Sequence, residues 1–188
     1  MEEERPDLRE HAAPDGTVTL MFSDIEGSTA INERLGDARW VELLREHNKL
    51  VRELAAAHGG FEVKSQGDGF MIAFASARRA LACAAEIQRA FAARNDARPA
   101  QPLRLRIGLH TGEAIREGDD FFGRHVALAA RIAAQAQGGE VLVSSLLRDL
   151  TEGAPDLRFG AEREAELKGL GGTHRVFSLR WEPQPTAA

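Results

Sequence analysis

The chain has 188 residues, of which 43% are hydrophobic and 28% charged, and its formal net charge is -5. A chain of this length and apolar content can bury one substantial core, so we expect a single domain. The negative balance argues against a general nucleic-acid binder, because affinity for the phosphate backbone comes from clustered lysine and arginine.

Cysteine usage and the chain start indicate the compartment. Cys83 is the only cysteine, which excludes an intramolecular disulfide and fits a reducing compartment. The sequence has no run of about twenty apolar residues, and its acidic start lacks the basic and apolar regions of a signal peptide. We therefore expect a cytoplasmic protein without a membrane span. A charged, proline-containing arm over 1–14, a domain over 15–182 and a flexible tail over 183–188 are predicted.

The first half of the domain contains clear periodicities. The β-branched and aromatic run 18–22 predicts a buried strand, and the small polar residues after it can start a helix. Residues 37–57 predict an amphipathic helix, and His47 on its apolar face is interpreted as a packed core or interface histidine rather than a ligand. A β-hairpin is predicted over 61–74 around Gly67-Asp68-Gly69. A second helix over 76–94 buries Cys83, and a loop is predicted over 95–102.

The second half alternates strands and helices. Residues 103–110 alternate by type, which predicts a strand with its four leucine and isoleucine side chains facing inward. A helix is predicted over 123–137 with a C-cap at Gly138-Gly139, then a strand over 140–143 and a short helix capped by Ser144. Residues 175–179 are predicted to close the sheet. This order indicates an α/β protein, specifically an α+β sandwich around a largely antiparallel sheet.

Two short motifs place a carboxylate where an apolar run ends. Asp24 lies in Phe-Ser-Asp-Ile-Glu-Gly-Ser-Thr, residues 22–29, and Asp68 lies in Lys-Ser-Gln-Gly-Asp-Gly-Phe, residues 64–70. Each alone has a structural explanation, as a helix N-cap or a tight turn. If the two turns lie side by side, their carboxylates converge, as Mg²⁺ requires. Backbone N–H groups of Gly27, Ser28 and Thr29 at a helix start would suit phosphate, so the pair indicates a nucleoside triphosphate site.

Several ordered motifs then match a family. Besides those two, they are LRIGLHTGE (105–113), DDFFGRHVALAARI (119–132), GGEVLVSS (138–145) and ELKGLGG (166–172). Together they resemble the catalytic domain of class III nucleotidyl cyclases, of the bacterial single-domain adenylyl cyclase type, from about residue 16 to residue 181. The resemblance implies a ferredoxin-like, palm-like fold.

The resemblance also implies a two-metal site. Asp24, Asp68 and the backbone carbonyl of Ile25 would hold two Mg²⁺ or Mn²⁺ ions per active site. Arg131 would stabilise charge on the α-phosphate, since a guanidinium is always charged and forks toward phosphate oxygens. Lys168 would reach the triphosphate from a loop, although Leu170 stands where the family often has a second lysine.

A lysine and an aspartate would read the base. Lys64 alone would be an exposed strand lysine, but the resemblance pairs it with Asp120. A lysine donates to adenine N1 and an aspartate accepts from the 6-amino group, whereas guanine presents the opposite edge. The pair therefore predicts ATP as the substrate, because the resemblance implies that a guanylyl cyclase would have a Glu and a small residue at these positions.

One position departs from the family pattern. Ala127 stands where relatives usually have an asparagine that orients the ribose, and losing that amide should slow the reaction through poorer positioning. His125 is two residues earlier, and residues two apart on a helix point in different directions, so we do not expect it to compensate.

The resemblance further implies a homodimer with two shared active sites, because one chain carries both halves. We therefore predict an adenylyl cyclase that converts ATP to 3′,5′-cyclic AMP and pyrophosphate. The alternatives are an inactive nucleotide-binding or dimerisation module, which Ala127 would allow, and a guanylyl cyclase. A diguanylate cyclase or polymerase-like palm domain would share the sheet and the metal-binding carboxylates, but it would leave Lys64 and Asp120 unexplained.

Overall fold

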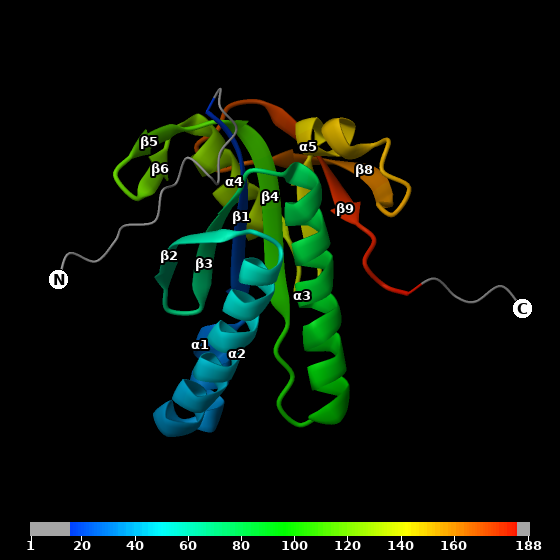
Figure 1. The fold of residues 1–188 in the computed structure, drawn as a ribbon. Coiled ribbons are helices and arrows are strands. Elements are labelled where there is room, and N and C mark those ends of the chain that lie inside the picture. The colour runs from blue at the N-terminus through cyan, green and yellow to red at the C-terminus, as the bar shows by residue number, and fades with distance from the viewer. Residues whose placement is uncertain (1–15, 184–188) are drawn as a thin grey trace, which may run out of the picture.

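The computed structural model describes residues 16–183, and its centre is a seven-stranded sheet (Figure 1). The strand order is β2-β3-β1-β4-β7-β9-β8, and only the β4–β7 pair is parallel. The strands are β1 (Thr17–Ile25), β2 (Phe61–Gln66), β3 (Gly69–Phe74), β4 (Leu105–Glu113), β7 (Val141–Ser144), β8 (Phe159–Glu166) and β9 (Thr173–Leu179). A separate two-stranded hairpin is formed by β5 (Ile115–Glu117) and β6 (Asp120–Phe122).

Helices cover both faces of the sheet. They are α1 (Ser28–Leu35), α2 (Asp37–Ala57), α3 (Ala77–Ala97), α4 (Arg124–Gln135) and α5 (Ser145–Thr151). The long helices α2 and α3 pack on one face, where Met21 and Ile25 of β1 join the largest core cluster. On the other face α4 packs on β1 and β4, where Leu20 and Ala129 share a second cluster. The predicted α+β sandwich with a largely antiparallel sheet is thus confirmed.

Close contact between α4 and the sheet depends on a glycine. A Cβ at Gly108 of β4 would lie 2.2 Å from the backbone nitrogen of Ala133 in α4. Atoms cannot approach that closely, so any side chain at position 108 would push the helix off the sheet. Gly108 therefore fixes how near α4 lies to β4.

Most predicted core positions are buried. Leu103, Leu105, Ile107 and Leu109 are fully buried, which confirms the inward face predicted for that strand. His47 is also fully buried and lies between the rings of Phe70 and Phe91, at centroid distances of 5.8 and 5.6 Å.

Cys83 is buried in α3, as the sequence predicts. Burial, with a smaller contribution from the charge of Glu86, raises the pKa of its thiol to about 12. The thiolate is therefore scarce near neutral pH, and this cysteine is a core residue rather than a nucleophile.

Several element boundaries differ from the sequence prediction. The strand expected over 103–110 spans Leu105–Glu113, and the strand expected over 140–143 spans Val141–Ser144. The strand expected over 18–22 continues to Ile25, because it pairs with β4 as far as Leu105. The helix expected to end at residue 94 continues to Ala97, and Asn95 lies inside it with both amide atoms bonded to the backbone of Leu103. The helix expected over 123–137 stops at Gln135, since Ala136 already has an extended backbone.

Three strands, β5, β6 and β8, were not predicted. The β5–β6 hairpin carries Asp120, and its strands have three residues each, too few for a visible alternation. The run 175–179 does not close the sheet, because β8 pairs along its outer side. Four of the eight residues of β8 are Glu or Arg and it lies at a solvated edge, so the apolar pattern of a buried strand is absent. The predicted arm over 1–14 and all of the predicted tail after Pro183 lie outside the described residues.

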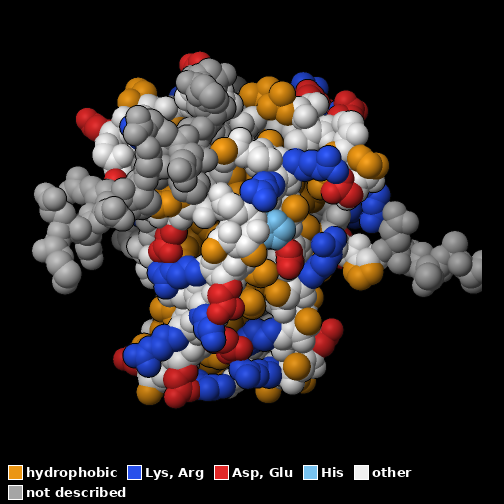
Figure 2. All heavy atoms as spheres, in the orientation of Figure 1, with side chains coloured by type: hydrophobic (Ala, Val, Ile, Leu, Met, Phe, Trp, Pro, Cys, Tyr) orange, Lys and Arg blue, Asp and Glu red, His pale blue; other side chains and the backbone are white. Residues whose placement is uncertain are grey.

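The surface in Figure 2 mixes charges of both signs, with acidic and basic side chains interspersed. Across residues 16–183, no helix has the length and apolar character needed to cross a membrane.

Candidate active site at the end of β1

Asp24 lies near the end of β1, directly opposite Arg106 of β4. The guanidinium donates to both carboxylate oxygens, from Nε to Oδ1 at 2.7 Å and from Nη2 to Oδ2 at 2.6 Å. The side chain of Asp24 is 39% exposed and that of Arg106 is 32% exposed. The hydrogen bond to Asp24 raises the pKa of Arg106, and the charges of Asp24, Glu26 and Asp68 add to this. Asp24 therefore already has a bidentate cationic partner.

Asp68 lies in the two-residue turn of the β2–β3 hairpin, where Gly67 has a φ of 60°. Its Oδ2 accepts a hydrogen bond of 2.7 Å from the backbone nitrogen of Ile25. This bond ties the hairpin turn to the residue after Asp24, so the two motifs lie together at one end of β1. Within residues 16–183, no group of three or more histidine, cysteine or acidic side chains has a metal-binding arrangement.

The start of α1 leaves its amides uncapped by side chains. Gly27 is the N-cap with a φ of 66°, no side chain caps the helix, and the first turn has no acidic residue. Ser28 and Thr29 are the first two helical residues, as the sequence predicts. The neighbouring Glu26 points elsewhere, since its Oε2 accepts from the backbone nitrogen of Gly138 at 2.5 Å. The first amides of α1 are therefore available to an anion.

Lys64 and Asp120 meet within one chain. Lys64 Nζ donates to Asp120 Oδ2 at 2.8 Å, joining β2 to β6. The Lys64 ammonium also lies 5.9 Å from the centroid of the Phe122 ring. The second oxygen of Asp120 accepts from the backbone nitrogen of Phe121 at 2.8 Å, which fixes the carboxylate. A donor and an acceptor thus stand side by side, 54% and 29% exposed.

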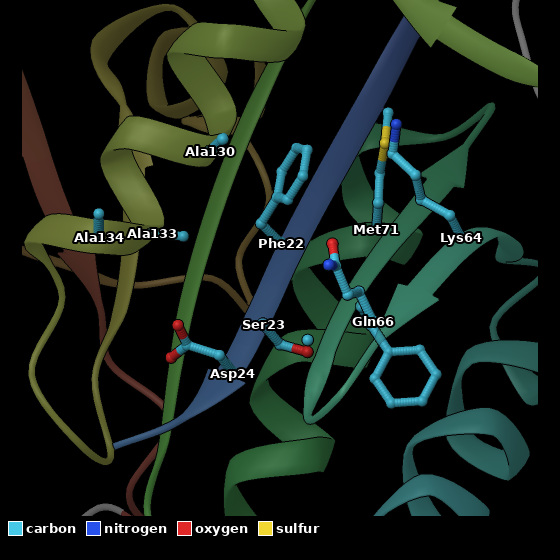
Figure 3. Close-up of a pocket in the computed structure, with 11 residues that line it drawn as sticks. Phe22, Ser23, Asp24, Lys64, Gln66, Met71, Ala130, Ala133 and Ala134 are labelled. Atoms are coloured by element: carbon cyan, nitrogen blue, oxygen red, sulfur yellow. The ribbon is translucent and has the colours of Figure 1, made fainter. Parts of the chain in front are cut away.

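A hollow of about 270 Å³ runs between β1, the β2–β3 hairpin and α4 (Figure 3). Asp24 and Lys64 lie toward opposite ends of it, with Phe22 and Met71 between them. Small side chains of α4 form one wall, and the full lining is Phe22, Ser23, Asp24, Lys64, Gln66, Gly69, Phe70, Met71, Ala130, Ala133 and Ala134.

Arg131 and Lys168 are not brought to the carboxylates. Arg131 is exposed on α4 and makes no hydrogen bond or ion pair with residues 16–183. Lys168 follows Leu167, a buried residue that packs with Ile132 and Ala136 of α4 and the turn after it. Both cations are thus associated with α4, whereas Asp24, Ile25 and Asp68 lie at the end of β1.

His125 belongs to a buried polar network. Its Nδ1 is 2.8 Å from Nε2 of His110, whose Nδ1 is 2.6 Å from Oγ of Ser144. The His125 ring lies so close to Gly112 that a Cβ there would be 2.5 Å from it. Burial, followed by the charges of His125 and His174, lowers the pKa of His110 to about 4. These contacts hold His125 against β4.

Sequence reasoning missed Arg106 and the His110 network. Arg106 alternates with inward-facing leucine and isoleucine, a signal of exposure, and its partner follows only from the β1–β4 register. The network joins residues of β4, α4 and β7, and no sequence spacing marks such a contact.

Comparison with known proteins identifies the family. The family model described as adenylate and guanylate cyclase catalytic domain matches residues 10–180. A putative adenylate cyclase 3 of Rhizobium meliloti (strain 1021) is 30% identical over 169 residues, covering 89% of this chain and 28% of that protein. An uncharacterized protein of Mycobacterium tuberculosis (strain ATCC 25618 / H37Rv) is 35% identical over 142 residues, covering 74% and 47%. The chain thus spans less than half the length of these two relatives.

Solved structures agree with the fold. An adenylate cyclase from Trypanosoma brucei, solved in its monomeric state, superposes with a TM-score of 0.81 at 27% identity, covering 96% of this chain and 97% of that one.

The buried His110 predicts a pH-dependent stability. Its pKa is about 4 in the folded chain against an ordinary 6.5, so the unfolded chain takes up a proton first as the pH falls. The contribution of His110 to the free energy of unfolding should be at its maximum above pH 6.5 and should fall by on the order of 3 kcal/mol toward pH 4. Denaturant unfolding at pH 7 and pH 5 measures this, and His110→Gln should lose less stability between the two pH values than wild type. An equal loss in wild type, His110→Gln and a His58→Gln control would contradict the assignment.

Proposed function

The chain belongs to the adenylate and guanylate cyclase catalytic-domain family, and we propose that it is an adenylyl cyclase that converts ATP to 3′,5′-cyclic AMP and pyrophosphate. The observation that carries the choice of ATP is the Lys64–Asp120 pair, a donor and an acceptor held 2.8 Å apart. The two carboxylates at the end of β1 supply the other requirement, a place for cations beside phosphate.

Lys64 and Asp120 suit adenine. The ammonium can only donate and the carboxylate can only accept, which complements adenine N1 and the 6-amino group. Guanine has a donor at N1 and an acceptor at O6, so both contacts would be repulsive. In the free chain the two side chains bond to each other, and each must exchange that partner for the base.

The residues at the end of β1 fit a divalent cation. Asp24, Asp68 and the carbonyl of Ile25 offer the hard oxygen ligands that Mg²⁺ and Mn²⁺ take. Asp68 keeps Oδ1 free of the Ile25 amide bond, and Asp24 is partly exposed, so both can turn oxygens outward. Bound there, two cations would lower the pKa of the ribose 3′-hydroxyl and neutralise charge on the triphosphate.

Arg106 must release Asp24 before that carboxylate can bind a cation. Its two hydrogen bonds to Asp24 neutralise the charge of a carboxylate that would otherwise repel the nearby Glu26 and Asp68. A cation and the guanidinium compete for the same two oxygens, so Arg106 weakens binding of a cation to the free chain. Released from Asp24, its guanidinium is available to the oxygens of a triphosphate.

The remaining cationic groups suit the reacting phosphates. In the proposed reaction the 3′-oxygen forms a bond to the α-phosphorus, its proton passes to solvent, and the bond from the α-phosphorus to the bridging oxygen breaks to release pyrophosphate. Arg131 stabilises charge that develops on the α-phosphate oxygens. Lys168 and the first amides of α1, at Gly27, Ser28 and Thr29, hold the departing pyrophosphate.

A homodimer completes the site in this proposal. Arg131 makes no hydrogen bond or ion pair with Asp24 or Asp68 within residues 16–183, and the residue is exposed. A twofold arrangement would set the α4 half of one chain against the β1 half of the other, giving two equivalent sites. The lack of a hydrogen bond or ion pair from Arg131 to either carboxylate within residues 16–183 supports this arrangement.

The proposed activity has a direct test. Purified chain with Mn²⁺ and ATP should form cyclic AMP and pyrophosphate, separated chromatographically. Asp24→Asn and Asp68→Asn should each lower the rate at least about 100-fold, since each removes the charge of a metal ligand without changing shape. Asp119→Asn, next to Asp120 in the exposed turn, is the matched control and should stay active. No cyclic nucleotide from wild type, or near-normal turnover of both variants, would refute the proposal.

Base selection is tested separately. Lys64→Glu combined with Asp120→Ala reverses the polar pattern of the base pocket, so ATP turnover should fall and relative GTP turnover should rise, by up to about 10⁴-fold. Cyclic AMP and cyclic GMP are measured from the two triphosphates under one set of conditions, with Asp119→Ala as control. An unchanged ATP preference in the double variant would remove both residues from base recognition.

Assembly is tested by mixing two impaired variants. Asp24→Ala leaves the Arg131 half intact and Arg131→Ala leaves the carboxylate half intact, so a mixed dimer contains one wild-type site. With random exchange, half the dimers are mixed, and activity should recover to about a quarter of wild type. If labelled chains exchange and activity does not return, each site is built within one chain.

A further inference from the structure

The segment from Asp120 to Arg131 carries few polar side chains. The residues between them are Phe121, Phe122, Gly123, Arg124, His125, Val126, Ala127, Leu128, Ala129 and Ala130. In the proposed site the base lies at Asp120 and the α-phosphate at Arg131, so the ribose must lie between the two along this segment. Only two side chains there, at positions 124 and 125, can form a hydrogen bond.

His125 is already committed to the interior. Its Nδ1 bonds to His110, and the two rings stack at a centroid distance of 5.1 Å. The absence of a side chain at Gly112 leaves room for the ring. Turning His125 outward would break the hydrogen bond to the buried His110, so His125 does not serve a ligand on the outer face of α4.

Arg124 has the opposite surroundings. It is the first residue of α4, is exposed, and makes no hydrogen bond or ion pair with residues 16–183. Seven residues make nearly two helical turns, so Arg124 and Arg131 point in almost the same direction, about 10 Å apart along the axis. Ala127 lies between them on the exposed side and ends at its methyl group. The path from Arg124 toward Arg131 is therefore open.

Helix stability does not explain an arginine at this position. Cations are unfavourable at a helix N-terminus because the backbone N–H groups there already carry partial positive charge. The first turn of α4 has no acidic residue, and Gly123 provides no side-chain cap. An arginine here costs the helix a little stability, which an external partner would offset.

We propose that Arg124 positions the ribose by donating a hydrogen bond to its 2′-hydroxyl. The inference rests on the proposed function, because that function sets the base at Asp120 and the α-phosphate at Arg131. The 3′-oxygen must face the α-phosphorus, which leaves the 2′-hydroxyl as the group on the same edge of the sugar that a donor can hold. Arg124 thus supplies, from one helical turn earlier, the polar contact that Ala127 lacks.

The test couples one side chain to one hydroxyl. Wild type, Arg124→Ala and Arg124→Lys are compared with ATP and 2′-deoxy-ATP as substrates in Mn²⁺. Wild type should prefer ATP by about 10- to 100-fold in kcat/KM, the range expected for a hydrogen bond from a charged group. In Arg124→Ala the two substrates should agree within about threefold, and kcat for ATP should fall more than KM rises, since the sugar is no longer held for attack. Arg45→Ala, which removes an exposed arginine of α2, should retain the wild-type preference.

Binding measured without turnover gives an independent readout. Calorimetric titration of the same variants with ATP and 2′-deoxy-ATP, with divalent cations removed by a chelator so that no turnover occurs, should show a ratio of dissociation constants in wild type that disappears in Arg124→Ala. An equal ratio in wild type and in Arg124→Ala overturns the inference. So does an equal loss for both nucleotides accompanied by weaker pyrophosphate binding, because that pattern assigns Arg124 to phosphate. A wild-type chain that binds ATP but forms no cyclic AMP refutes the proposed function alone, and the titration still decides the role of Arg124.

Discussion

Nine consecutive residue pairs hold β1 against β4, and this antiparallel register is the constraint on which the candidate site depends. Side chains alternate along a strand, so a slip of one residue would turn every side chain of β1 to the other face. The core prevents that slip, because Met21 and Ile25 are buried against α2 and α3 while Leu20 is buried toward α4. Asp24 therefore faces Arg106, and the hydrophobic core determines where the acidic group lies.

Long periodic segments were predictable from sequence. The helix α2 has the predicted bounds of Asp37–Ala57, since more than five turns of a consistent apolar face leave no alternative. Elements held by tertiary contacts were not. The hairpin β5–β6 is too short to show a pattern, and β8 consists largely of charged residues paired at a sheet edge. The end of α3 was missed because Asn95, a residue typical of loops, caps the backbone of Leu103 from inside the helix.

The same distinction applies to the site. Asp24 and Asp68 stand out in sequence because each interrupts an apolar run, and the bond from Ile25 to Asp68 accounts for their proximity. The contact of Lys64 with Asp120 spans 56 positions and followed from the family resemblance, since neither residue has a local signal. Arg106 was overlooked because an outward-facing arginine on a strand is ordinary until its neighbour across the sheet is known. A motif of neighbouring residues can be recognised in one sequence, whereas a contact between two strands depends on the register of the folded sheet.

The burial of Cys83 has a practical consequence for studying this molecule in solution. Because it is the only cysteine and its thiol has a pKa of about 12, thiol-directed reagents at neutral pH find almost no reactive sulfur. A fluorophore or spin label coupled to one cysteine introduced on the surface would therefore report from that position alone. Labelling of Cys83 would therefore contribute almost no signal, and this cysteine need not be replaced before a surface cysteine is introduced.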